Sequence, residues 1–229
     1  MRYNRWAAWA ALIPCFTASL VNAANLAPAP VTAARLAAAG NGRGAPACAL
    51  CHGANGEGNA LIGFPRLAGL PERYLTDQLE NFATGRRSNV MMTPIARTLS
   101  VEERAATANF YAHLIGQSHS PASSPTTSDA PTTTTGETLA VRGRWSQGVP
   151  ACAQCHGRTG QGVGDSFPAL AAQPALYLEN QLLAWQSGIR DPGPLGLMGA
   201  IAKKLSADDV TAVAIYLSAL PPRTGDPAP

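Results

Sequence analysis

Two copies of one cysteine and histidine motif are the residues of this chain that could most clearly do chemistry. The motifs are Cys48, Cys51 and His52 in ACALCHGANG, and Cys152, Cys155 and His156 in ACAQCHGRTG. Two cysteines spaced in this way with a histidine directly after them could form a disulfide, half of a zinc site, a redox dithiol or a haem anchor. Each use implies a different protein, so the surrounding sequence has to discriminate among them.

The start of the chain has the layout of a secretory signal peptide. A short basic stretch, MRYNR, precedes the apolar run WAAWAALIPCFTASLV and a small-residue cleavage site at Val21-Asn22-Ala23. The run is too short and too interrupted for a transmembrane helix, because Pro14 and Ser19 lie within it. We therefore expect residues 1–23 to be removed on export and the protein to be periplasmic.

Export changes the meaning of the cysteine count. Cys15 lies within the expected signal peptide, and the other four cysteines all lie in the two motifs. Four cysteines in an exported protein ordinarily suggest disulfides. A mature chain of about two hundred residues, however, can build its own hydrophobic cores and does not need disulfides to fold.

The similarity between the two regions extends well beyond the cysteines. Phe64-Pro65 and Leu67 recur as Phe167-Pro168 and Leu170, and Tyr74-Leu75 with Gln78-Leu79 recurs as Tyr177-Leu178 with Gln181-Leu182. The offset is 104 at the cysteines, 103 through the middle and 106 at the end of the repeat. These changes in the offset correspond to one residue lost and three gained in the second copy. Such small insertions and deletions fall in loops, so we expect two repeats that share one fold.

The spacing of apolar residues predicts helices in both repeats. In PERYLTDQLENFATG the apolar residues recur every three to four positions, with Pro71 suited to the first turn and Gly85 to the end. Ser100 followed by Glu103, and Ser206 followed by Asp209, have the pattern of a capping box at the start of the last helix. No segment alternates convincingly as a strand would, so the predicted fold class is all-α.

A linker separates the repeats. Residues 117–140, QSHSPASSPTTSDAPTTTTGETLA, are rich in Ser, Thr and Pro and have almost no large apolar side chains, which predicts an extended or disordered segment. The expected organisation is a first domain at 24–116, the linker, a second domain at 141–221 and a tail at 222–229.

Among the four uses of the motif, haem attachment fits best. Zinc needs four ligands, usually in two close pairs, and each repeat offers only one pair. A redox dithiol normally begins a helix in a βαβ unit, whereas these repeats are predicted to be helical. Two thiols on one helical turn can each form a thioether to a porphyrin vinyl group, and the next residue then directs its imidazole at the iron. The sequence therefore predicts two covalently attached haem c groups, with His52 and His156 as iron ligands.

The second axial ligand can be identified by counting methionines. Met198 is the only methionine in the second repeat, and it precedes GAIAKKLS as Met92 precedes TPIARTLS. Both lie eight positions before the matching serine. The alignment therefore selects Met92 and Met198 as iron ligands, and we expect Met91 to fill space as an ordinary core residue.

Other polar residues carry little functional signal. Of seventeen basic residues Arg2 and Arg5 lie in the signal peptide, which leaves fifteen against fourteen acidic residues and gives no indication of nucleic-acid binding. His113 and His119 have no counterpart in the second repeat and are expected at the surface. We also expect solvated surface positions, rather than a docking patch, for Arg86, Arg87, Lys203 and Lys204.

In these residues the chain resembles the class I c-type cytochromes, and its tandem arrangement most resembles the dihaem cytochrome c4 family. The resemblance rests on both CxxCH motifs, FPRLAGL and FPALAAQ, YLTDQL and YLENQL, and MTPIARTLS and MGAIAKKLS. It implies two class I cytochrome c-like helical domains in tandem. It also implies that the carbonyls of Pro65 and Pro168 accept hydrogen bonds from the proximal histidines and so fix their orientation.

The sequence departs from that family in two places. The linker is longer than usual and rich in Thr and Pro, which argues against rigid pairing of the domains. Leu70 stands in the first repeat where Gln173, the residue expected from the family, stands in the second. We expect the second difference to have only local effects.

His/Met ligation leaves no iron position open for substrate and raises the reduction potential relative to bis-His ligation. We therefore expect an electron carrier, not an enzyme, between a quinol-oxidising complex and a terminal oxidase or reductase. Tethering two haems on one chain would keep their effective concentration high. We expect a monomer, and peripheral association with a membrane is compatible with the sequence.

Two alternatives to the carrier remain. The first is an electron-accepting subunit of a periplasmic dehydrogenase that oxidises sulfide or another small molecule. The second is a catalyst: a dihaem peroxidase would have only His113 as an in-domain histidine for changed ligation, and a thiosulfate oxidiser with a cysteine ligand is disfavoured because no spare cysteine remains.

Overall fold

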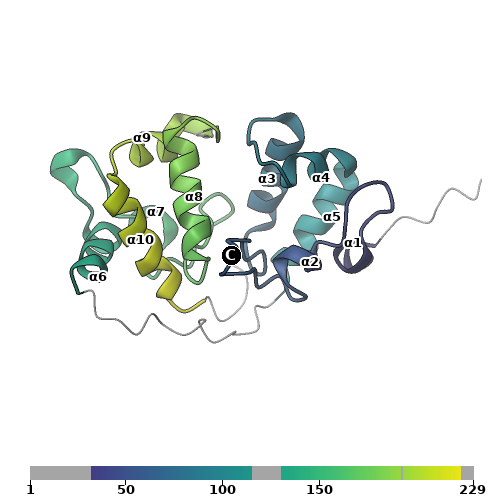
Figure 1. Cartoon of the computed structure of the whole chain (residues 1–229), viewed down its shortest axis with the longest axis horizontal. Helices are drawn as coiled ribbons and strands as arrows, with labels where there is room; N and C mark the ends of the chain where they lie inside the picture. Colours follow the sequence, from purple (N-terminus) through teal and green to yellow (C-terminus); the bar gives the residue numbers. More distant parts are fainter. Residues whose placement is uncertain (1–31, 115–129, 192, 223–229) are drawn as a thin grey trace, which may run out of the picture. The chain divides into compact units, whose positions relative to one another are not determined.

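A computed structural model describes residues 32–114, 130–191 and 193–222 (Figure 1). We call residues 32–114 the first half and residues 130–222 the second half. The expected signal peptide, His119 and most of the predicted linker lie outside the described residues. In the described part of the chain, no helix has the length and apolar character needed to cross a membrane.

The two halves repeat the same order of helices. The first half contains α1 (Ala33–Ala39), α2 (Ala49–His52), α3 (Glu72–Thr84), α4 (Met92–Thr98) and α5 (Val101–Ala112). The second half contains α6 (Ala130–Glu137), α7 (Ala153–His156), α8 (Ala175–Gln186), α9 (Leu197–Ala202) and α10 (Ala207–Ala219). Its short elements are a π-helical turn at Thr138–Arg142 and 3-10 turns at Trp145–Gln147 and Pro194–Gly196. The described residues form isolated β-bridges but no sheet, so the all-α prediction is confirmed.

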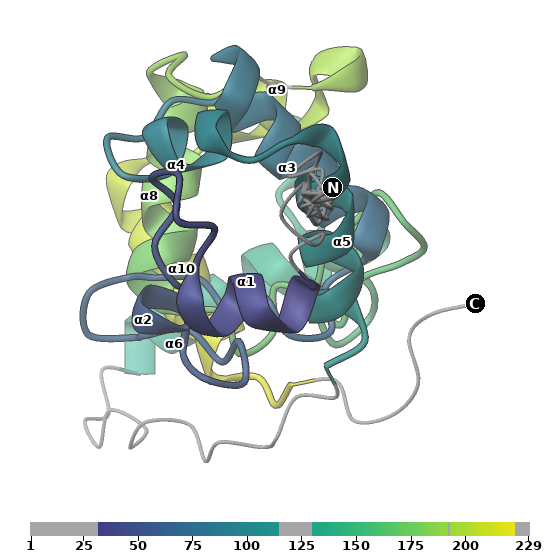
Figure 2. The ribbon, with the colours of Figure 1, turned by 90° about the vertical axis from the view of Figure 1, so that its right-hand side faces the viewer.

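The last helix of each half forms the centre of its packing. In the first half α5 lies against α1 and α3, and in the second half α10 lies against α6 and α8 (Figures 1 and 2). Tyr111 of α5 is buried among apolar neighbours that include Leu70 and Leu75. Leu217 of α10 is buried in the corresponding cluster with Leu139. The long helices therefore form a scaffold on which the short, motif-bearing helices are held.

The helix boundaries follow the signals in the sequence. Helix α3 begins after Pro71 and ends at Gly85, which has the left-handed conformation with φ 83°. Both capping boxes form as predicted, at Ser100 with Glu103 and at Ser206 with Asp209. These caps satisfy N–H groups that a helix start leaves without partners, so they fix where α5 and α10 begin.

The structure corrects the predicted end of the linker. Residues Ala130–Glu137 are α-helical and the π-helical turn follows directly, whereas the sequence predicted an extended or disordered segment to residue 140. Leu139 and Ala140 are buried, and Gly136 lies so close to α10 that a Cβ there would meet the Ala212 carbonyl oxygen. Tertiary packing against α10 thus overrides the poor helix propensity of this Thr-rich stretch.

Candidate haem sites

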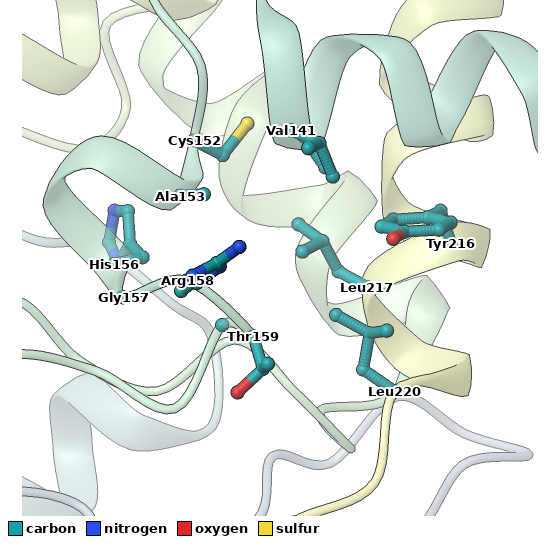
Figure 3. Close-up of a pocket in the computed structure, with 12 residues that line it drawn as sticks. Val141, Cys152, Ala153, His156, Gly157, Arg158, Thr159, Tyr216, Leu217 and Leu220 are labelled. Atoms are coloured by element: carbon teal, nitrogen blue, oxygen red, sulfur yellow. The ribbon is translucent and has the colours of Figure 1, made fainter.

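Each CxxCH motif forms one short helical turn. Cys48 and Cys152 stand at the N-termini of α2 and α7, and the histidines are the last residues of these helices. Figure 3 shows the second copy, with Cys152 before α7 and His156 at its end. The described cysteines are all free thiols, so neither pair forms a disulfide. One turn therefore places two thiols and an imidazole together, as haem attachment requires.

Both histidines are buried and oriented by a backbone carbonyl. His52 Nδ1 lies 2.9 Å from the Pro65 oxygen, and His156 Nδ1 lies 2.8 Å from the Pro168 oxygen. Because a carbonyl can only accept, Nδ1 must carry the proton, and this leaves the lone pair of Nε2 free to bind a metal. Burial lowers the pKa of both histidines, which favours this neutral ligand form over the imidazolium.

The first cysteine of each motif is not activated as a redox nucleophile. Burial raises the pKa of Cys48, and it raises the pKa of Cys152 to about 11. A redox dithiol instead needs a lowered thiol pKa. Among the described residues no three His, Cys, Asp or Glu side chains are grouped to hold a metal ion by themselves. The geometry therefore gives no support to the dithiol and zinc alternatives.

A deep cleft lies beside the first motif. Its volume is about 470 Å³, within the range of about 300–1,000 Å³ for cofactor sites. Apolar side chains from α3 and α4, including Leu79, Phe82 and Ile95, form much of its wall. Thr107 also lines the cleft, and its buried Oγ1 has no hydrogen-bond partner in the described part of the chain. Buried unpaired hydroxyls are uncommon, so this one fits a cleft that receives another group.

The two aligned methionines each lie on the first turn of a short helix. Met92 is the first residue of α4 and Met198 the second residue of α9, and both are half-buried. Met91 and Met92 both line the cleft, although Met91 is 44% exposed. Met91 is therefore not the buried core residue that the sequence predicted.

The structure corrects the expectation that Arg87 is a solvated surface residue. Arg87 and its equivalent Arg190 are each only 7% exposed, and both line the cleft. Each guanidinium packs over an aromatic ring of its own half, Phe82 for Arg87 and Trp185 for Arg190. Such stacking is favourable for a cation that has been removed from water.

Each of these arginines is also hydrogen-bonded to both halves. The acceptors of Arg87 are Gln78, Gln181 and Tyr177, and those of Arg190 are Gln181, Gln78 and Tyr74. Sequence reasoning missed this network, although the signal was available, because both arginines follow the 103-residue offset seen at the tyrosines and glutamines. The halves therefore make specific contacts, which the length of the linker had not suggested.

The cleft has the composition that a haem would need. Its lining residues, all of them described, include two arginines and no Asp or Glu. Buried cations normally have an anionic partner. A flat apolar ring that carries two carboxylates and is anchored at Cys48 and Cys51 would match both the apolar walls and the unpaired positive charge.

The four other polar residues that were predicted at the surface and that the structure describes are all exposed. His113 is exposed at the end of α5, where its Nδ1 lies 2.9 Å from the Asn109 carbonyl oxygen, and it does not line the cleft. Lys203 and Lys204 are exposed, and Lys204 donates to the Gly148 carbonyl. Arg86 is exposed as well and donates to Asn81.

Comparisons with known proteins agree with this geometry. The cytochrome c family model matches residues 37–114 and 135–221. The thiosulfate dehydrogenase electron acceptor of Thiomonas intermedia is 48% identical over 177 residues, which is 77% of this chain and 80% of that protein.

Two solved structures share the fold. Thiosulfate dehydrogenase (TsdBA) from Marichromatium purpuratum aligns with a TM-score of 0.74 and 40% identity, and the match covers 82% of this chain and 40% of that chain. Reduced cytochrome c4 from Pseudomonas stutzeri aligns with a TM-score of 0.67 and 32% identity, over 76% of this chain and 93% of that chain. The predicted resemblance is thereby confirmed. The chain belongs to the cytochrome c family, as a dihaem electron-transfer protein of the cytochrome c4 type that carries one haem c at each CxxCH motif.

Proposed function

We propose that this protein is the electron acceptor of a periplasmic thiosulfate dehydrogenase. The observation that carries the proposal is the 48% identity to a thiosulfate dehydrogenase electron acceptor. The alignment with part of a longer thiosulfate dehydrogenase chain supports it independently. These findings favour the dehydrogenase-subunit alternative over the respiratory carrier that we first expected from the sequence.

The proposed iron ligands are His52 and Met92 in the first half, and His156 and Met198 in the second. Support comes from the equivalent positions of the methionines, each on the first turn of a short helix that follows the motif. With both axial positions filled by protein, the site would exchange electrons without exchanging ligands. The haem supplies the redox chemistry when it is bound, and the chain supplies its ligands and environment.

The remaining residues of the first site have three roles in this proposal. Cys48 and Cys51 anchor the haem, and Pro65 orients His52 through its carbonyl. The apolar wall excludes water, which would otherwise have to reorganise at each change of charge. In the second half Cys152, Cys155 and Pro168 are proposed to act in the same way.

A direct transfer experiment tests the proposal. The oxidised holoprotein is mixed with a purified thiosulfate dehydrogenase catalytic subunit, and haem reduction is followed by stopped-flow absorbance after thiosulfate is added. We expect reduction of both haems that depends on thiosulfate and on the catalytic subunit, and none from thiosulfate alone. A quinol-oxidising complex supplied with quinol is the comparison. Efficient reduction by that complex, with none by the dehydrogenase, would contradict the proposal and support the function of a respiratory electron carrier.

Export is tested separately. We propose that residues 1–23 are cleaved and that the mature protein is periplasmic. N-terminal sequencing of the protein from a periplasmic fraction should begin at residue 24 or 25. A full-length N-terminus on a membrane fraction would contradict cleavage.

A further inference from the structure

Gln173 belongs to the second half but holds a peptide of the first half. Its side-chain Oε1 accepts from the Arg66 N–H at 3.1 Å, and its Nε2 donates to the Arg66 carbonyl at 2.8 Å. Only one orientation of the amide satisfies both bonds, because a peptide N–H donates and a carbonyl accepts. Gln173 is just 3% exposed, so these bonds are shielded from competing water. We call this pair of hydrogen bonds the Gln173 clamp.

A single peptide group connects the Gln173 clamp to His52, the proximal histidine of the first site. The Arg66 N–H that it holds belongs to the same peptide group as the Pro65 carbonyl, and that carbonyl lies 2.9 Å from His52 Nδ1. The hydrogen bonds therefore run in series from His52 through one peptide group to Gln173. Linked hydrogen bonds polarise one another. An acceptor on the Arg66 N–H makes the Pro65 oxygen a stronger acceptor for His52.

The equivalent contact in the opposite direction, from the first half to the second, has no amide side chain. Leu70 is the first-half equivalent of Gln173, and it is buried in an apolar cluster against which Ala169, the equivalent of Arg66, packs. A leucine side chain has no atom that could accept from the Ala169 N–H. The first haem site therefore receives a hydrogen bond across the contact between the halves, whereas the equivalent contact of the second site is apolar among the described residues.

The Pro65-Arg66 and Pro168-Ala169 peptide groups are otherwise packed alike. Gly58 approaches the first so closely that a Cβ would lie 2.6 Å from the Arg66 nitrogen, and Gly162 approaches the second with a corresponding distance of 2.8 Å to the Ala169 nitrogen. The two histidine bonds also differ by only 0.1 Å. The duplicated frame thus provides an internal reference against which the effect of the Gln173 clamp can be measured.

We propose that Gln173 is a positioning residue for the first haem, although it lies in the half that carries the second. It strengthens the hydrogen bond from His52 to Pro65, which increases electron donation by the imidazole and stabilises the ferric state. The Gln173 clamp therefore lowers the reduction potential of the first haem and biases electrons toward the second. This inference rests on the proposed ligation by His52 and is independent of which protein donates the electrons.

Redox titration of the holoprotein tests this role. Met198→His serves as the background, because bis-His ligation should move the second haem to lower potential and let the first be titrated separately. Adding Gln173→Met, which keeps the length of the side chain and removes its amide, should raise the midpoint potential of the first haem. Within the Met198→His background, the midpoint potential of the second haem should be the same with and without Gln173→Met. Gln173→Leu, which copies the residue of the first repeat, should have the same effect.

Gln186→Met is the matched control. Gln186 is also a part-buried glutamine of the second half, but its Nε2 donates to the Ala202 and Leu205 carbonyls of its own half. Its replacement should leave the first haem potential unchanged. A shift equal to that of Gln173→Met would mean that any lost glutamine acts in this way, and the proposal would fall.

The sign of the shift separates positioning from loosened packing. If Gln173→Met merely let water reach the first haem, water would stabilise the more highly charged ferric form and lower its potential. A downward shift, or none, overturns the proposal. Proton NMR of the ferrous protein gives a second readout, because the Nδ1–H of His52 should exchange faster in Gln173→Met while that of His156 stays unchanged. If Met198→His does not change the midpoint potential of the second haem, the proposed ligation by Met198 is wrong. The NMR comparison then decides the role of Gln173.

Discussion

The wall of the first cleft carries Thr107 and Tyr111 on α5, whereas the equivalent positions of α10 in the second half are Val213 and Leu217. Burial raises the pKa of Tyr111 well above its ordinary range, so it remains a neutral phenol. By contrast, the Pro65 and Pro168 carbonyls that contact the two histidines are equivalent, and their distances to the Nδ1 atoms differ by only 0.1 Å. Duplication has thus preserved the groups that hold each haem, while the surroundings have diverged.

The crossing of the first and last helices shows the same pattern. Gly136 of α6 packs directly against the backbone of α10. Its first-half equivalent on α1 is Ala33, because the carbonyls of Leu36 and Leu139, 103 residues apart, both accept from the first cysteine of their motif. The second half continues from α6 into a π-helical turn, while α1 ends at Gly40. The two halves therefore reach one fold through different local packing, and substitutions at equivalent positions should have unequal effects.

The largest predicted effect concerns the methionine ligands. Met92→Ala and Met198→Ala should each remove about half of the methionine-to-iron charge-transfer band of the oxidised protein, because each removes one proposed axial ligand. Met91→Ala is the control for the first half and should leave the band intact. If Met91→Ala removed it and Met92→Ala did not, the equivalence between Met92 and Met198 would be wrong.

A medium effect is expected at the helix crossing. Gly136→Ala should lower the free energy of unfolding by about 1–3 kcal/mol, because the new Cβ would overlap the Ala212 carbonyl. The measurement is chemical denaturation followed by circular dichroism. Ala33→Gly in the first half should cost less than about 1 kcal/mol, because Ala33 is the first residue of α1 and the full propensity cost of glycine applies within a helix. Equal costs in the two halves would contradict the closer packing inferred for α6.

The smallest effect concerns the helix caps. Burial alone would raise the pKa of Glu103 and Asp209, but hydrogen bonds from Ser100 and Arg43 in one case, and from Arg144 and Ser206 in the other, lower both pKa values overall. A depressed carboxyl pKa contributes stability above its unfolded value, of about 4, that is lost as the pH falls through the folded value. The protein should therefore become less stable below about pH 4.

Substitution at the caps separates the two contributions. Glu103→Gln and Asp209→Asn should each cost about 0.5–2 kcal/mol at neutral pH and reduce the acid sensitivity of unfolding. Denaturation curves at several pH values provide the measurement. An acid dependence that both variants leave unchanged would show that other carboxylates dominate.

Local features were the most predictable part of this protein. The Pro71 start and Gly85 end of α3, and the capping boxes at Ser100 and Ser206, are confirmed because each depends on residues within a few positions of one another. The π-helical turn at Thr138–Arg142 was missed for the opposite reason. The Thr-rich segment before this turn has poor helix propensity, and burial of Leu139 against α10 stabilises the turn.

The sequence by itself determined the chemistry of the two motifs, their duplication and the all-α class, because these follow from short spacings and from an internal repeat. Only the tertiary structure decided that Arg87 is buried rather than solvated, and that Gln173 holds the peptide behind His52. Both outcomes depend on residues about a hundred positions apart in the chain, and no local pattern specifies which of them meet. A difference that the sequence presented as a local exchange, Leu70 for Gln173, thereby became the clearest asymmetry between the two haem sites.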